Sequence, residues 1–168
     1  MKKTLIVYAS SHGCTESCAY KLAESLPVQP EMINLKQTGK IDLSAFDMVL
    51  IGGSIHAGKM QRKVKQFCSK HLSELIQKQI GLFLCCMEQD AEKAQQQFDS
   101  AYPAELRQIS LANGFFGGEF NFEKMNALQR YIIKKIAKTD KSISRISEKN
   151  ISEFASIVSK QLKSPGEK

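Results

Sequence analysis

The sequence lacks tryptophan, has only four prolines and contains no long hydrophobic run. Near the N-terminus the apolar stretch covers residues 5–9, which is too short for a membrane span or for the hydrophobic core of a signal peptide. No internal repeat or low-complexity tract is present, so solenoid, collagen-like and disordered chains are excluded. What remains is a compact globular protein, for which 168 residues and a hydrophobic content of 42% provide one core.

Acidic residues are in deficit, with 17 Asp and Glu against 24 Lys and Arg, which gives a net charge of +7. Most of the surplus belongs to residues 101–168, which carry 12 basic and 7 acidic side chains. A positive surplus raises nucleic acid, anionic lipid and acidic small molecules as partners. No nucleic-acid recognition motif accompanies the charge, so nucleic acid is not a predicted partner.

The five cysteines are odd in number and form no CxxC pair. Without an export signal, they are predicted to be free thiols in a reducing cytoplasm. Cys85 and Cys86 end an apolar run and are interpreted as packing residues, because adjacent cysteines form strained bridges. No cluster of further ligands accompanies Cys14 and Cys18, so no metal site is predicted.

Apolar runs alternate with helical patterns along the chain, which is typical of an α/β fold. The runs have no polar alternation, as expected for parallel strands buried on both faces. We predict a doubly wound, five-stranded parallel sheet in a domain over residues 1–163, followed by a flexible tail at 164–168. The predicted strands are 4–9, 31–35, 48–51, 80–86 and 109–116, and the predicted helices are 14–26, 64–76, 91–101, 122–137 and 150–162. Such sheets bind ligands beyond the carboxyl ends of their strands.

The loop between the first strand and the first helix has the composition of an anion-binding loop. It consists of Ser10, Ser11, His12, Gly13, Cys14 and Thr15. Free N–H groups at a helix start and the helix dipole favour a phosphate there, and hydroxyls add donors. Neither GxxxxGK[ST] nor GxGxxG is present. The alternative is that the loop only caps the helix.

Ser10, Gly13 and Thr15 fit the pattern [ST]x[ST]GxT, and the loop resembles the phosphate loop of flavodoxins, with His12 where Thr or Ser is usual. The resemblance implies a flavodoxin-like fold with strand order 2-1-3-4-5. It also implies that residues 10–15 surround the phosphate of FMN.

A second segment follows the third strand and contains Ser54, Ile55, His56, Ala57 and Gly58. It resembles the flavodoxin loop that lines one face of the isoalloxazine ring, although Ile55 and His56 stand where electron carriers commonly have a large aromatic residue. The resulting hypothesis is a less covered flavin that a second substrate can approach. His56 is either a donor to flavin or substrate or a solvent-facing residue. No catalytic residue is predicted.

The segment Asn113–Phe120, together with Gly53-Ser54-Ile55, resembles the menaquinone-dependent protoporphyrinogen oxidases. The apolar positions that follow, from Met125 to Ile136, extend that resemblance. It implies an FMN-dependent oxidoreductase that oxidises protoporphyrinogen IX and passes electrons to a quinone. The alternative is a flavodoxin-type electron carrier that docks to redox partners and has no substrate of its own.

Residues 124–138 combine five basic side chains, no acidic one and a stripe of Leu128, Tyr131, Ile132 and Ile136, with Ile133 outside the stripe. A helix of this kind either lies on an anionic membrane surface or packs its stripe on the sheet. The first alternative predicts a cytoplasmic protein that is peripheral at the inner face of the membrane.

Overall fold

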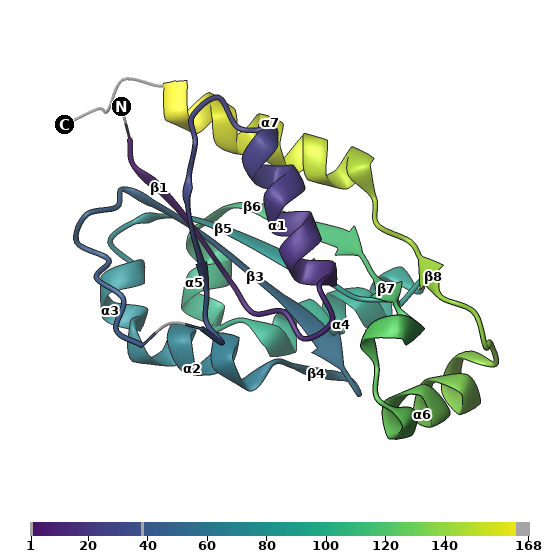
Figure 1. Cartoon of the computed structure of the whole chain (residues 1–168). Coiled ribbons are helices and arrows are strands. Elements are labelled where there is room, and N and C mark those ends of the chain that lie inside the picture. Colours follow the sequence, from purple (N-terminus) through teal and green to yellow (C-terminus); the bar gives the residue numbers. More distant parts are fainter. Residues whose placement is uncertain (1, 38, 164–168) are drawn as a thin grey trace.

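The computed structural model describes residues 2–37 and 39–163 as a parallel sheet between two layers of helices (Figure 1). The strands are β1 Thr4–Tyr8, β2 Glu31–Asn34, β3 Met48–His56, β4 Lys59–Met60, β5 Gln79–Cys85, β6 Ser110–Gly117, β7 Glu119–Phe120 and β8 Ile143–Ser144. The helices are α1 Cys14–Glu24, α2 Arg62–Lys70, α3 Leu72–Leu75, α4 Ala91–Ala101, α5 Ala104–Ile109, the 3₁₀ turn η1 Phe122–Lys124, α6 Ala127–Ala137 and α7 Glu148–Lys163.

The predicted doubly wound α/β fold is confirmed. The parallel strands follow the order β2-β1-β3-β5-β6, which is the predicted order 2-1-3-4-5 once the two-residue β4, paired antiparallel with β3, is set aside. The boundary at residue 163 stays a prediction, and the tail predicted at 164–168 lies outside the described residues. Among the described helices, none combines the length and hydrophobicity that a membrane span needs.

Both faces of the sheet are buried, as the continuous apolar runs predict. On β1, Leu5 and Val7 belong to the core under α2, α3, α4 and α5, whereas Ile6 and Tyr8 belong to the core under α1 and α7. Alternate side chains of a strand point to opposite faces, so one strand contributes to both cores. Figure 1 shows α1 and α7 together on one face.

Strand β3 is longer than predicted. The sequence predicts a strand that ends at Ile51, but the structure continues it through Gly52 and Gly53 to His56. The glycines leave room for protein side chains: a Cβ at Gly52 would overlap the Phe83 ring, and one at Gly53 would overlap the Met60 sulfur. Side chains of the protein therefore fill the space beside these two glycines.

The helix predicted at 122–137 is also divided. A 3₁₀ turn at 122–124 precedes α6, and Asn126 starts α6 with a capping box in which its side chain accepts a hydrogen bond from the Gln129 N–H. The segment that contains α6 lies between β7 and β8 in the chain. These two strands pair with each other, with Glu119 opposite Ser144 and Phe120 opposite Ile143.

The alternative in which the stripe of α6 packs on the sheet is wrong. No residue of α6 is buried, and Leu128 and Ile136 are 68% and 71% exposed. The sheet face beside α1 is covered instead by α7, whose Ile151, Phe154 and Val158 are buried. Figure 1 shows α6 at the end of the molecule, away from the sheet faces.

We expect Gly52→Ala to lower the free energy of unfolding by about 1–3 kcal/mol, because the added methyl group forces Phe83 out of its stack on Phe116, where the ring centroids are 4.8 Å apart. Urea denaturation followed by circular dichroism measures the change. Gly39→Ala is the control, since nothing lies within 4 Å of its added Cβ. Equal unfolding midpoints for the two variants would contradict this account of the core.

Candidate functional site

A cavity of about 240 Å³ lies beyond the carboxyl ends of the parallel strands. It is the place where ligands bind in sheets of this topology. The structure brings nine of the eleven predicted site residues to its wall: Ser10, Ser11, His12, Cys14, Thr15, Ser54, Ile55, His56 and Ala57. Gly13 does not line this cavity, and Gly58 lines a neighbouring one.

The loop at residues 10–15 leaves the start of α1 without a side-chain cap. Gly13 is the N-cap with a left-handed φ of 88°, a conformation that glycine adopts without strain. The Ser10 hydroxyl accepts a hydrogen bond from the Gly13 N–H at 3.0 Å, which tightens the loop itself. The loop therefore caps α1 through the Gly13 backbone and not through a side chain, and the positive end of the helix dipole faces the cavity.

Thr15 is the most buried residue of this loop. Its side chain is 1% exposed, and its Oγ1 has no hydrogen-bond partner among the residues that the structure describes. A buried hydroxyl without a partner is costly. Because Thr15 lies in the first turn of α1 and on the cavity wall, a ligand with acceptor atoms at this helix start satisfies it.

Two ammonium groups add positive charge to the same loop. Lys36 Nζ donates a hydrogen bond to Ser11 Oγ at 2.8 Å, and Gln61 Nε2 donates to the same oxygen at 3.1 Å. Lys124 Nζ would lie 2.7 Å from a Cβ added to Gly13, so its charge covers the loop. Neither lysine is predicted from the sequence, since both are distant from the loop along the chain.

The second predicted segment forms a tight hairpin beside the cavity. His56 and Lys59 pair at its base, and Ala57 and Gly58 both have positive φ, 48° and 75°, as in the two-residue turns that suit twisted strands. The hairpin therefore presents Ile55, His56 and Ala57 to the cavity.

The two histidines of the site face each other, with ring centroids 5.8 Å apart. His56 Nε2 lies 2.8 Å from Ser54 Oγ, and His12 Nε2 lies 3.3 Å from Gln129 Oε1 of α6. Burial of part of the ring, together with the nearby charges of His12 and Lys36, lowers the pKa of His56. Its imidazole is therefore neutral at pH 7 and keeps one nitrogen as an acceptor.

Sequence reasoning missed the residues that close the cavity from the later strands. They are Cys85, Cys86, Met87, Gly118, Glu119, Phe120, Met125, Gln129, Ile132 and Ile133. The topology rule that ligands bind after each strand end points to the first six. Gly118, Glu119 and Phe120 also lie in the Asn113–Phe120 segment, although no binding role was assigned to them. Ile133 lies outside the exposed stripe of α6, and this offset turns it toward the cavity.

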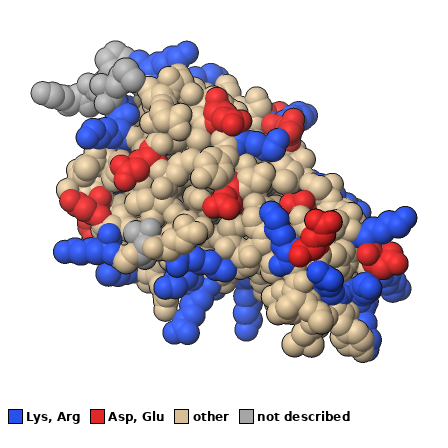
Figure 2. Space-filling model, in the orientation of Figure 1, with Lys and Arg blue, Asp and Glu red and all other residues tan. Residues whose placement is uncertain are grey.

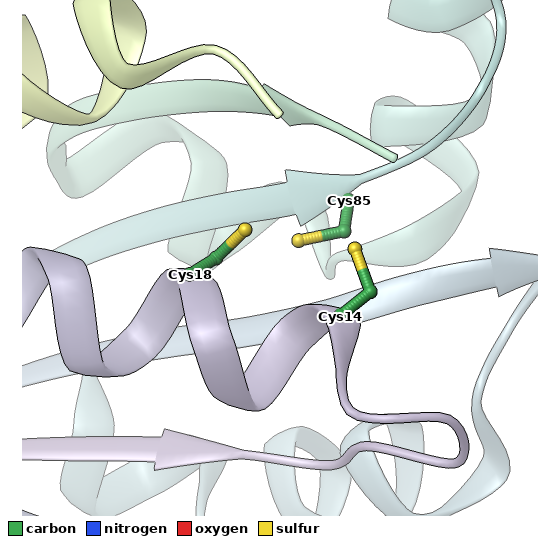
Figure 3. A group of neighbouring side chains, drawn as sticks. All are labelled: Cys14, Cys18 and Cys85. Atoms are coloured by element: carbon green, nitrogen blue, oxygen red, sulfur yellow. The ribbon is translucent and has the colours of Figure 1, made fainter. Parts of the chain in front are cut away.

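Three thiols meet under the cavity, although the sequence analysis predicts no such cluster (Figure 3). The Sγ atoms of Cys14, Cys18 and Cys85 all lie within 4.8 Å of one another. Hydrogen bonds from the thiols of Cys18 and Cys85 lower the pKa of Cys14 to about 4. The hydrogen bond with Cys14 raises the pKa of Cys18 to about 12, and the contacts with Cys14 and Cys18 raise that of Cys85 well above its usual value.

The chain matches the family model described as flavodoxin domain over residues 5–147. No curated protein sequence matches it. Among solved structures, it is similar to a short-chain flavodoxin associated with a non-canonical PDU bacterial microcompartment, with 18% identity, a TM-score of 0.60 and coverage of 96% of this chain and 99% of that one.

Two further flavodoxin structures are similar at comparable distance. The two-electron reduced flavodoxin of Megasphaera elsdenii has 16% identity and a TM-score of 0.56 over 94% of this chain and 98% of that one. The Fusobacterium nucleatum flavodoxin bound to flavin mononucleotide has 12% identity and a TM-score of 0.54 over 96% and 99%. These likenesses agree with the observed sheet order, and since the family model spans most of the sequence, the chain belongs to the flavodoxin domain family.

Proposed function

We propose that this protein is an FMN-dependent oxidoreductase whose cofactor phosphate is held by residues 10–15. The observation that carries the proposal is the buried, unpartnered Thr15 hydroxyl at an uncapped helix start. A phosphate provides acceptor oxygens for this hydroxyl and for the N–H groups of the first turn. Lys36 and Lys124 offset its negative charge from the two sides of the loop.

The remaining residues fit the other parts of FMN. The hairpin backbone at Ile55, His56 and Ala57 forms one wall of the cavity, and Phe120 and Met87 contribute to its lining from other loops. When bound, FMN supplies hydride and electron-transfer chemistry. The neutral His56 imidazole, fixed by Ser54, offers a hydrogen bond to the ring or to a substrate beside it.

We expect Thr15→Val to weaken FMN binding by about 10- to 100-fold, since a hydrogen bond to a charged group contributes about 1.5–3 kcal/mol. Fluorescence titration of the apoprotein with FMN measures the affinity. Thr4→Val is the matched control, because Thr4 Oγ1 is also buried without a described partner but lies on β1, away from the cavity wall. Equal losses in both variants would contradict the phosphate site.

The substrate that we propose is protoporphyrinogen IX, with a quinone as the electron acceptor. A second cavity of about 530 Å³ adjoins the first and shares Ile55, His56 and Phe120 with it. Its wall adds the apolar Ile136 and the guanidinium of Arg145. An apolar hollow with a cation at its edge suits a large ring that carries carboxylates. The Asn113–Phe120 segment supports this substrate by its resemblance to the porphyrinogen oxidases.

The competing function is electron transfer between partner proteins, for which the chain needs a docking face and no second cavity. Anaerobic mixing of the FMN form with protoporphyrinogen IX separates the two functions. We expect the flavin absorbance to bleach and a menaquinone analogue to restore it. Arg145→Gln raises the half-saturating porphyrinogen concentration about tenfold, since it removes a charge-assisted hydrogen bond. Lys149→Gln leaves it unchanged, because the Lys149 side chain is exposed on α7 and does not line the cavity. A flavin that stays oxidised would establish the carrier instead.

The surface of α6 supports contact with an anionic lipid surface, where a quinone resides. Its exposed apolar residues, which include Leu128 and Tyr131, project to solvent, and residues 124–138 hold five cations and no acid. Figure 2 shows blue side chains around a tan surface at the end of the molecule that carries α6. Since Gln129, Ile132 and Ile133 of the same helix line the first cavity, a membrane that held α6 would lie next to the flavin site.

We expect the protein to sediment with vesicles that contain anionic lipid and to remain in solution with neutral ones. Lys134→Gln with Lys135→Gln should lower the vesicle-bound ratio about 30-fold, because each cation near the surface contributes about 1 kcal/mol. Lys63→Gln with Lys65→Gln on α2 changes the net charge equally and serves as the control. The same loss in both double variants, or equal binding to neutral vesicles, would refute the docking face.

A further inference from the structure

The three clustered thiols come from two elements that the fold holds together. Cys14 begins α1, and Cys18 lies four residues later on the same helix face. Cys85 ends β5. Figure 3 shows the three sulfur atoms pointing toward one another from the helix and the strand.

Simple packing does not account for this convergence. Cys68 and Cys86 show how cysteines pack alone in this core, because both are buried in the opposite layer and join no ligand cluster among the described residues. Cys18 and Cys85 are 0% and 2% exposed, whereas Cys14 is half-buried at the cavity wall. The cluster thus has a closed interior and one side that opens into the site.

We propose that Cys14, Cys18 and Cys85 bind one divalent thiophilic ion, Zn²⁺, with the fourth coordination position open to the cavity. Zn–S bonds of about 2.3 Å in a tetrahedral site place the sulfurs about 3.8 Å apart. All three Sγ–Sγ distances are within 4.8 Å, so closure by about 1 Å at most completes the triangle. Small side-chain rotations of the three cysteines supply that movement.

Other thiol chemistry fits the same geometry less well. A disulfide joins only two sulfurs and leaves the third without a role, and all five cysteines of the chain are free. An iron–sulfur cluster spreads its cysteines over two or more irons and takes four of them, so three thiols that converge on one point do not match it. Soft thiolates select zinc or copper(I), and a divalent ion leaves one net negative charge on three thiolates where a monovalent ion leaves two, which favours Zn²⁺ in a buried setting.

The proton and bond balance of binding is simple. The thiol protons pass to solvent, and each sulfur forms one bond to the ion. The positive end of the α1 dipole offsets the remaining negative charge. Because no His, Asp or Glu joins the cluster among the described residues, the fourth position is left to water, a small anion or a thiol that enters through the cavity. Binding also ties the start of α1 to the end of β5.

The test uses the reduced, metal-free full chain, titrated with Zn²⁺ against a chromophoric chelator and analysed for metal content. We expect one Zn²⁺ per chain. Cys14→Ser, Cys18→Ser and Cys85→Ser should each weaken binding more than about 100-fold, because loss of even an outer-shell partner costs 10–100-fold. Cys86→Ser is the matched control, since Cys86 adjoins Cys85 but packs in the opposite core layer, and it should bind as the unmodified chain does.

Cys14→Ser carries the test if the buried variants fail to fold, because Cys14 is half-buried at the end of the helix. Co²⁺ added in place of Zn²⁺ should give thiolate-to-metal absorption that Cys14→Ser weakens and Cys86→Ser retains. Substoichiometric Zn²⁺ in the reduced chain, or full binding by Cys14→Ser, would overturn the proposal. Thr15→Val should bind Zn²⁺ normally, so failure of the FMN site and failure of the metal site are distinguished.

Discussion

Alternate residues of β1 face different cores, with Leu5 and Val7 on one side and Ile6 and Tyr8 on the other. A sheet of such strands must be covered by helices on both faces. Parallel strands linked by these helices place all their carboxyl ends at one edge. The loops at residues 10–15, the 54–58 hairpin and the ends of β5 and β6 are therefore brought together by the same burial that stabilises the core.

The covering requirement also explains why α6 is unusual. Helices α1 and α7 already cover one face of the sheet, and α2 to α5 cover the other, so no apolar surface remains for α6 to bury. The pairing of β7 with β8 holds together the two ends of the segment that contains α6. The helix therefore stays beside the site. One side of α6 then closes the cavity through Ile133, while Leu128 stays exposed.

Features that depend only on neighbouring residues can be predicted from the sequence. The loop at residues 10–15 is predicted from a glycine and hydroxyls between a strand and a helix, and the structure gives Gly13 the left-handed conformation that the tight turn needs. The end of β3 was mispredicted because Gly52 and Gly53 indicate a loop in isolation. Their neighbours Phe83 and Met60, which come from other strands, make them strand residues.

The alternation of strands and helices, the doubly buried sheet and the loop after β1 follow from the sequence, because burial pattern and turn chemistry are properties of neighbouring residues. Which distant side chains share the site depends on the tertiary structure. Lys36 and Lys124 reach residues 10–15 from other segments, and Cys85 meets Cys14 and Cys18 across the gap between β5 and α1. Such meetings depend on strand order and helix packing, which no stretch of sequence encodes alone.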